Sequence, residues 1–150
     1  MKTTVFLVGA GPGDPGLITV KAEKLLKIAD VIVYDYLSNP IFLNKANNNC
    51  KLINAGKRLG FKAMSQAQIN KKLVSLAKQK YKNIVRLKGG DPLLFGRGGE
   101  EAEYLKKNKI NFEIVPGVTS AIAVPAYAGI PISHRDSTSS FCIVTGHEDP

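Results

Sequence analysis

Short apolar runs rich in β-branched residues alternate along this chain with longer segments whose apolar positions recur at helical spacing. The short runs predict strands at residues 4–8, 31–34, 51–54, 84–87 and 112–115. The longer segments predict helices at residues 20–28, 40–45, 66–80 and 100–107, and one more after Gly117 that Pro125 must kink or end. This alternation is typical of a parallel sheet with crossover helices, so the sequence predicts a five-stranded, doubly wound α/β domain.

A polar, turn-rich segment follows the last predicted helix. Residues 131–140, PISHRDSTSS, carry no apolar period, which indicates a linker. Residues 141–145, FCIVT, then have the composition of a buried strand. We therefore expect residues 1–130 to form one domain. Residues 141–150 are expected to begin a second α/β domain that is otherwise absent.

The composition and charge of the chain exclude several classes of protein and of binding partner. The 150 residues carry a formal net charge of +9, which favours an anionic partner. Most of the excess is lysine scattered over predicted helices, with no aromatic-interleaved basic strip, so we do not expect nucleic acid. No apolar run approaches the roughly 18 residues of a membrane span or forms a signal peptide, so we expect no membrane partner and a cytoplasmic protein. The 2 cysteines are far apart and lack CxxC spacing, which excludes a disulfide scaffold and a zinc module.

Every unusual cluster of residues follows a predicted strand. In an open parallel sheet the carboxyl ends of the strands share one rim, and ligands bind in the crevice outside it. We therefore expect one binding site built from five loops. These clusters are residues 9–16, Asp35, residues 56–58, residues 88–99 and residues 116–120.

The first loop contains a formal G-x-G-x-x-G match at residues 11–16, between a strand and a helix. With Asp35 as the ribose-binding acid, it leaves open a Rossmann-type dinucleotide-binding dehydrogenase. Pro12 and Pro15 remove amide donors from the loop, and Asp14 places negative charge where a phosphate would lie. A purely structural turn is the other reading of the motif.

The fourth loop is the richest in chemistry. Gly89 and Gly90 allow close approach of backbone to a ligand, and the Asp91 carboxylate can accept hydrogen bonds from ribose hydroxyls or an ammonium group. Arg97 is a cation among glycines and suits a substrate carboxylate. The two glutamates that follow, Glu100 and Glu101, are expected to complement the dipole of the next helix.

Several segments together resemble the amino-terminal part of the tetrapyrrole methylase superfamily, and most closely its uroporphyrinogen-III C-methyltransferase branch. The resemblance covers essentially the whole chain. The glycine loop occurs across the superfamily, whereas the YD, GKR and RLKGGDPxxFGRGGEE patterns are together specific to the branch. The segments are VFLVGAGPGDPGLITVKA, ADVIVYDYL, NAGKRLGFKAMSQAQIN, VRLKGGDPLLFGRGGEEAEYL and VPGVTSAIAVPAYAGIPISHR.

The resemblance implies transfer of methyl groups from S-adenosylmethionine to two pyrrole carbons of uroporphyrinogen III. The products are precorrin-2, which leads to sirohaem or cobalamin, and S-adenosylhomocysteine. It also implies two α/β domains with the cofactor between them, a homodimer and no metal. A methylase of a later corrin precursor is the alternative within the superfamily, and a folded fragment that binds nothing tightly is the alternative without catalysis.

The resemblance also implies roles for individual residues. Asp35 matches the family's proposed proton acceptor, and Lys57 matches its proposed proton donor. The anionic tetrapyrrole is expected to meet Arg58, Lys88 and Arg97. Cofactor contacts are expected from Pro12, Gly89, Gly90, Asp91, Leu94, Thr119 and Ser120.

Overall fold

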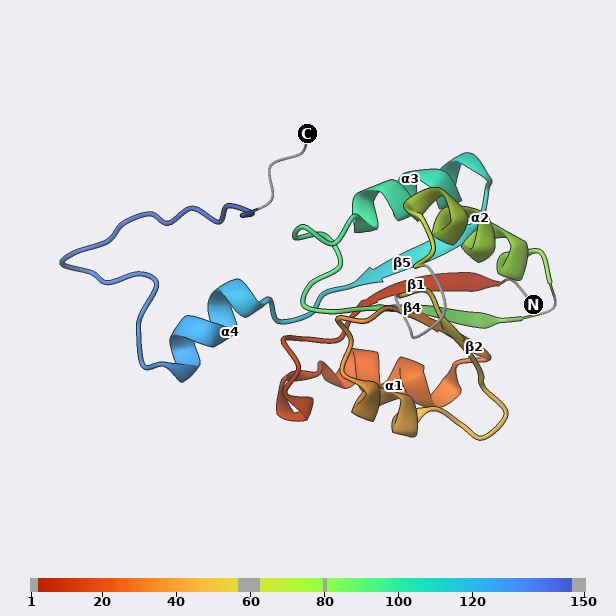
Figure 1. Cartoon of the computed structure of the whole chain (residues 1–150), viewed down its shortest axis with the longest axis horizontal. Coiled ribbons are helices and arrows are strands. Elements are labelled where there is room, and N and C mark those ends of the chain that lie inside the picture. Colours follow the sequence, from red (N-terminus) through yellow and green to blue (C-terminus); the bar gives the residue numbers. More distant parts are fainter. Residues whose placement is uncertain (1–2, 57–62, 80, 147–150) are drawn as a thin grey trace.

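A computed structural model describes residues 3–56, 63–79 and 81–146 of the chain. It contains a five-stranded, all-parallel sheet with helices on both faces (Figure 1), which confirms the predicted fold class. The strands, which agree with the predicted ones to within a residue at most ends, are β1 Thr4–Gly9, β2 Val31–Tyr34, β3 Lys51–Asn54, β4 Asn83–Lys88 and β5 Asn111–Val115.

The predicted helices form with small changes at their ends. The longest, α2, begins at a capping box in which Ser65 and Gln68 bond each other's backbone, and it ends at Ala77 rather than at residue 80. Helix α4 continues through Pro125 and ends soon afterwards. The helices are α1 Val20–Ile28, α2 Gln66–Ala77, α3 Gly98–Lys107 and α4 Ser120–Tyr127, with short 3-10 helices η1 Pro15–Leu17 and η2 Pro40–Lys45.

The order of the strands is β3-β2-β4-β1-β5. In a Rossmann sheet the first strand lies beside the second, so that the glycine loop and the ribose-binding acid are neighbours. Here β4 lies between β1 and β2 and pairs with both. The dinucleotide-binding reading of the glycine loop is therefore wrong in its geometry, because the loop after β4 separates the glycine loop from Asp35.

Two apolar cores lie on the two faces of the sheet. One joins the sheet to α2 and α3, and the other joins it to α1 and η2. Side chains of β4 alternate between them: Ile84 packs in the α2/α3 core, whereas Val85 and Leu87 pack in the α1 core. By the same alternation, Arg86 and Lys88 lie on the face covered by α2 and α3.

Residues beyond α4 run away from the sheet and then return past α4 (Figure 1). The predicted linker, residues 131–140, is exposed along almost its whole length. The predicted strand at residues 141–145 does not form, because backbone hydrogen bonds of a strand need a neighbouring strand and none of the described residues supplies one. The division of the chain at residues 130 and 140 stays a prediction.

None of the helices in the described ranges has the length and apolar character needed to cross a lipid bilayer.

Candidate functional site

A cavity of about 980 Å³ lies at the carboxyl ends of the strands and is lined by residues from all five strand-end loops. This confirms that the unusual clusters share one rim. Among the residues expected to contact a cofactor or substrate, its lining contains Pro12, Asp35, Lys88, Gly89, Gly90, Asp91, Leu94, Arg97, Thr119 and Ser120. Lys57 and Arg58 lie outside the described residues.

Glycines bring three of these loops into direct contact. The amide of Gly11 donates to the carbonyl of Gly90 over 3.2 Å, and the amide of Gly90 donates back to Gly11 over 2.8 Å. Both residues have positive φ angles, 79° and 63°. A Cβ at Gly9 would lie 2.6 Å from the backbone of both Gly117 and Gly90. These glycines therefore allow loop to approach loop, whereas the close approach to a ligand that the sequence suggested for Gly89 and Gly90 stays a prediction.

Asp91 joins the loop after β4 to the loop after β5. Its Oδ1 accepts from the amides of Leu93 and Leu94, at 2.8 and 3.3 Å, and its Oδ2 accepts from the amide of Gly117 at 3.1 Å. The carboxylate was expected to face a ribose or an ammonium group. The Asp91 carboxylate lines the cavity. Because its oxygens accept from backbone amides of two loops, it also holds these loops together at the rim.

Asp35 stands at the end of β2 with its side chain 24% exposed. Its Oδ1 accepts from the amide of Leu37 at 3.2 Å and from the hydroxyl of Ser38 at 3.3 Å, so it stabilises its own turn. Its Oδ2 accepts from Nη2 of Arg86 at 2.9 Å. The residue therefore both caps a turn and presents a carboxylate to the cavity.

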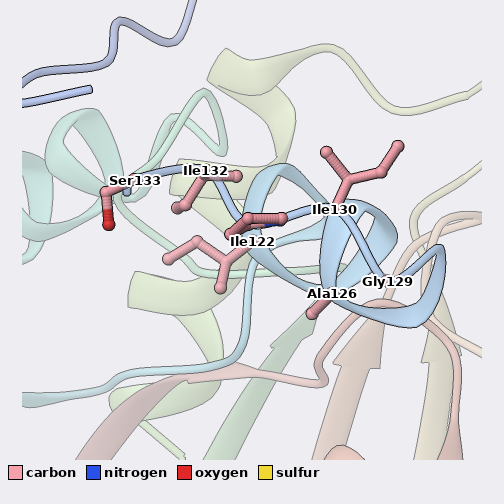
Figure 2. Close-up of a pocket in the computed structure, with 7 residues that line it drawn as sticks. Ile122, Ala126, Gly129, Ile130, Ile132 and Ser133 are labelled. Carbon is pink, nitrogen blue, oxygen red and sulfur yellow. The ribbon is translucent and has the colours of Figure 1, made fainter. Parts of the chain in front are cut away.

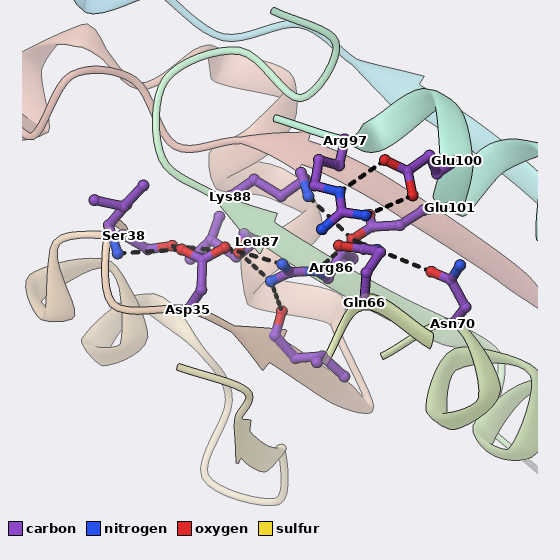
Figure 3. Close-up of polar contacts among 12 residues, drawn as sticks. Asp35, Ser38, Gln66, Asn70, Arg86, Leu87, Lys88, Arg97, Glu100 and Glu101 are labelled. Carbon is purple, nitrogen blue, oxygen red and sulfur yellow. Dashed lines mark hydrogen bonds and ion pairs between the residues drawn. The ribbon is translucent and has the colours of Figure 1, made fainter. Parts of the chain in front are cut away.

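A cluster of buried charges lies beside Asp35 (Figure 3). Oε1 of Glu101 accepts from Nε of Arg86 at 3.1 Å and from Nζ of Lys88 at 3.0 Å. Gln66, from α2, donates to the same oxygen at 3.2 Å. Burial, reinforced by the nearby Arg86 guanidinium, lowers the pKa of Lys88 below its ordinary value.

Arg86 was not predicted as a site residue. Glu101 lies in the first turn of α3, as expected of a residue that complements the helix dipole, but its full burial in the charged cluster was not predicted. The signals were present in the sequence. Arg86 has the same phase as core residue Ile84 in a buried strand, and Glu101 has the helical spacing of buried Gly98, Ala102 and Leu105.

Arg97 occupies the position before α3 with a left-handed backbone, φ 56°. Its guanidinium bonds both oxygens of Glu100, at 2.7 and 2.9 Å, and this hydrogen bond lowers the pKa of the Glu100 carboxyl. The side chain is exposed at the edge of the cavity. An incoming carboxylate would therefore compete with Glu100 for Arg97.

Tyr127 connects α4 to the glycine loop. Its hydroxyl donates to Oδ2 of Asp14 over 2.6 Å, which lowers the pKa of Asp14 and raises that of Tyr127. Asp14 also accepts from the amide of Gly16 at 2.6 Å. Because Thr119 and Ser120 begin α4, this contact ties their helix to the loop that carries Pro12.

A second hollow, of about 420 Å³, lies between α4 and the segment that follows it (Figure 2). Its lining is apolar apart from Ser133 and contains no titratable side chain. The groups able to hold charge or move protons are therefore gathered at the larger cavity, and we place the candidate site there.

The larger cavity combines three kinds of surface. Leu37 and Leu94 offer apolar area for a flat ring, Asp35 offers a carboxylate, and Lys88 and Arg97 offer cations. A volume near the upper end of the roughly 300–1,000 Å³ typical of small-molecule sites leaves room for more than one ligand group. The arrangement suits an anionic ligand and a flat apolar ring.

Comparison with known proteins gives matches over almost the whole chain. A family model described as Tetrapyrrole (Corrin/Porphyrin) Methylases matches residues 4–150. The S-adenosyl-L-methionine-dependent uroporphyrinogen III methyltransferase of Methanosarcina barkeri is 58% identical over 146 residues, covering 97% of this chain and 57% of that protein. The chain therefore spans little more than half the length of this relative.

Two solved structures share the fold. The uroporphyrin-III C-methyltransferase of Thermus thermophilus, complexed with S-adenyl homocysteine, matches with a TM-score of 0.76 at 42% identity, covering 91% of this chain and 56% of that one. A cobalt precorrin-4 methyltransferase matches with a TM-score of 0.76 at 33% identity, covering 89% and 53%.

Proposed function

We propose that this chain, which belongs to the tetrapyrrole (corrin/porphyrin) methylases, acts in methyl transfer from S-adenosylmethionine to uroporphyrinogen III. The product is precorrin-2, methylated on two pyrrole carbons, which leads to sirohaem and cobalamin. The observation that carries the proposal is the strand-end cavity. Its lining includes residues of the two sequence patterns that distinguish the uroporphyrinogen branch, YD and RLKGGDPxxFGRGGEE.

The cavity fits the proposed cofactor in size and in chemistry. Leu94 offers an apolar surface to an adenine ring, and the hydroxyl-bearing residues Thr119 and Ser120 lie at the start of α4. The lining also includes Gly11 and Gly90, whose backbones bond each other, and Asp91, whose Oδ2 accepts from the amide of Gly117. The residues that would hold the cofactor are Pro12, Gly89, Gly90, Asp91, Leu94, Thr119 and Ser120.

When bound, S-adenosylmethionine supplies a methyl group on a sulfonium sulfur; a pyrrole carbon forms a bond to it while the electron pair of the broken carbon–sulfur bond returns to sulfur. The chain's residues contribute mainly by holding the attacking carbon in line with that bond, because such positioning can supply about 7–11 kcal/mol of the barrier. The methylated ring is cationic and must release a proton. Asp35 presents a carboxylate to the cavity and accepts this proton. Lys57 is proposed as the proton donor on the resemblance alone.

The anionic substrate is proposed to bind the cations at the edge of the cavity. Lys88 and Arg97 line it, and Arg58 is added by the resemblance. Arg97 is the most accessible of the described pair, because Lys88 is buried against Glu101.

Arg97→Ala is expected to weaken uroporphyrinogen binding by about 10-fold or more, since hydrogen bonds to charged groups contribute about 1.5–3 kcal/mol. Binding of S-adenosylhomocysteine is expected to change far less. Titration of both ligands against the variant measures the difference. Lys106→Ala, which removes an exposed cation from the far end of α3, is the matched control. Unchanged uroporphyrinogen affinity in Arg97→Ala would remove Arg97 from the substrate site.

A methylase of a later corrin precursor is the second candidate. The backbone does not separate the two candidates, because the two solved neighbours match with the same TM-score. Sequence identity favours uroporphyrinogen, at 42% to the Thermus thermophilus uroporphyrin-III C-methyltransferase against 33% to the cobalt precorrin-4 methyltransferase.

The test is turnover by the natural protein at its full length. We expect incubation with methyl-labelled S-adenosylmethionine and uroporphyrinogen III to give a tetrapyrrole carrying two labelled methyl groups and two equivalents of S-adenosylhomocysteine, read by mass spectrometry. Methylation of a later corrin precursor but not of uroporphyrinogen would favour the second candidate. Absence of S-adenosylhomocysteine with either substrate would contradict the methylase proposal.

Assembly as a homodimer and a cytoplasmic location without nucleic-acid or membrane partners complete the proposal. The resemblance supports the dimer, and the scattering of lysines over helix faces supports the lack of a nucleic-acid partner. Light scattering on the eluting full-length protein is expected to give twice the protomer mass.

A further inference from the structure

We propose that Arg86 is the positioning residue for Asp35, and that Glu101 fixes Arg86 in the orientation which this requires. The inference rests on the proposed function, in which the Asp35 carboxylate accepts the proton released after methyl transfer. It assigns roles to Arg86 and Glu101, the first and last residues of the RLKGGDPxxFGRGGEE pattern, for which the sequence indicated no part in binding or proton transfer.

The guanidinium of Arg86 is held on all sides. Its Nη2 donates to Oδ2 of Asp35 at 2.9 Å, and its Nε donates to Oε1 of Glu101 at 3.1 Å. Its Nη1 donates to the carbonyl of Leu87 at 3.0 Å. Because the guanidinium is planar, these bonds fix its plane, and the fixed plane sets where Oδ2 of Asp35 must lie (Figure 3).

Burial makes this arrangement stiff. The side chains of Arg86 and Glu101 are 3% and 0% exposed, whereas that of Asp35 is 24% exposed and lines the cavity. Arg86 belongs to β4, which has partners on both sides in the middle of the sheet. The Asp35 carboxylate, which reaches the cavity, is therefore bonded to Arg86, whose strand cannot move independently of the sheet.

Stability alone does not account for the cluster. Replacing buried ion pairs by well-packed apolar side chains is often neutral or stabilising by about 1–4 kcal/mol. The cluster also leaves Oε2 of Glu101 buried without a hydrogen-bond partner among the described residues. Glu101, which is imperfectly satisfied, and Arg86, which is charged at a position in phase with Ile84, are better explained by what they hold in place. Of the cluster's charged side chains that line the cavity, Asp35 is the most exposed.

Lys88 provides an internal comparison. Its ammonium bonds the same Oε1 of Glu101, at 3.0 Å, from the same face of the same strand. Its hydrogen bond goes to Glu101 and not to Asp35, which receives the guanidinium of Arg86. Arg86 therefore differs from its neighbouring buried cation in the contact that the proposal uses.

The experiment is a set of double-mutant cycles in turnover by the full-length natural protein. Asp35→Asn alone is expected to lower kcat by about 100-fold, in the range for loss of a general base. Arg86→Met and Arg86→Lys are each expected to lower kcat by about 10-fold or more while KM for uroporphyrinogen and the affinity for S-adenosylhomocysteine stay near wild type. A lysine ammonium cannot reproduce the planar fork, so it is expected to rescue folding more than kcat.

The double variants show whether Arg86 acts through Asp35. If Arg86 acts through Asp35, then Asp35→Asn with either Arg86 variant loses no more kcat than Asp35→Asn alone. Asp35→Asn with Lys88→Met is expected to show losses that multiply. Thermal unfolding shows which Arg86 variant folds. If Arg86→Met does not fold, the cycle uses Arg86→Lys, which keeps a buried cation opposite Glu101.

Three results would overturn the inference. Multiplying losses for Asp35 and Arg86 would show that Arg86 acts independently of Asp35. If Asp35→Asn combined with Lys88→Met also loses no more kcat than Asp35→Asn alone, any damage to the cluster has the effect assigned to Arg86. If the wild-type protein produces no S-adenosylhomocysteine, the proposed function fails and the positioning role fails with it. If wild-type turnover is normal but the losses from the Asp35 and Arg86 substitutions multiply, only the role of Arg86 fails.

Discussion

Glu101→Gln is expected to lower the free energy of unfolding by about 3–5 kcal/mol, the range for removing one partner of a buried ion pair. The carboxylate is fully buried, and its Oε1 accepts from both Arg86 and Lys88. A neutral amide of the same shape would leave two buried cations with only Asp35, at the edge of the cluster, to balance them. Urea denaturation of the variant and the wild-type protein measures the difference.

The adjacent Glu100 offers a matched control. It is exposed on the first turn of α3, where it forms an ion pair with the exposed Arg97. Exposed pairs contribute about 0–1 kcal/mol, so Glu100→Gln is expected to change stability by no more than that. Equal effects of the two substitutions would contradict the account of Glu101 as the counter-ion of the buried cluster.

Gly9→Ala is expected to destabilise the fold by about 1–3 kcal/mol, the range for overpacking, and to weaken S-adenosylhomocysteine binding by at least about 10-fold. The added Cβ would lie 2.6 Å from the backbone of both Gly117 and Gly90. Neither obstacle is a flexible side chain, so the loops after β1, β4 and β5 would have to separate. These are the loops that carry Pro12, the Gly89–Asp91 stretch and Thr119.

Gly99→Ala tests whether the effect belongs to the position or to glycine replacement in general. Gly99 lies in the first turn of α3, and a Cβ there would meet nothing within 4 Å. Alanine is favoured over glycine in a helix by about 1 kcal/mol, so this variant is expected to be at least as stable as wild type. Calorimetric titration with S-adenosylhomocysteine and urea denaturation apply to both variants, and similar losses of affinity would contradict the role given to the convergence of loops at Gly9.

Strand and helix periods predicted the layered fold well, because each element is long enough to show its apolar phase. The order of strands could not be read in the same way. Whether β4 or β1 lies beside β2 depends on how the crossover helices pack, and the G-x-G-x-x-G match together with Asp35 left open a Rossmann order in which β1 would lie beside β2. The FCIVT run shows the same limit, since a strand-like composition does not supply a pairing partner.

For the site, the sequence predicted which residues lie together but not which groups they bond. Strand-end position correctly gathered Pro12, Asp35, Gly90, Asp91 and Thr119 around one cavity, because the rim follows from parallel topology alone. The partners of each side chain were not predictable from single positions. Asp91 turned out to bind backbone amides of its own and the neighbouring loop, and Gly90 turned out to bond Gly11 rather than only face a ligand.

The buried cluster was recoverable in principle. Arg86 alternates with core residues of β4, and Glu101 falls on the buried stripe of α3, so each charge occupies an apolar phase. Two opposite charges in apolar phases of elements that cover one another predict an ion pair. What sequence could not supply is the third partner, since the approach of Asp35 to Arg86 depends on the register in which β2 pairs with β4.

The central claim is that the strand-end cavity is a site for S-adenosylmethionine. Calorimetric titration of the full-length natural protein with S-adenosylhomocysteine, and in parallel with NAD, tests it most directly. We expect saturable binding of S-adenosylhomocysteine that Gly9→Ala weakens and Gly99→Ala preserves, with no binding of NAD. Selective binding of NAD, or binding of S-adenosylhomocysteine that neither substitution changes, would contradict it.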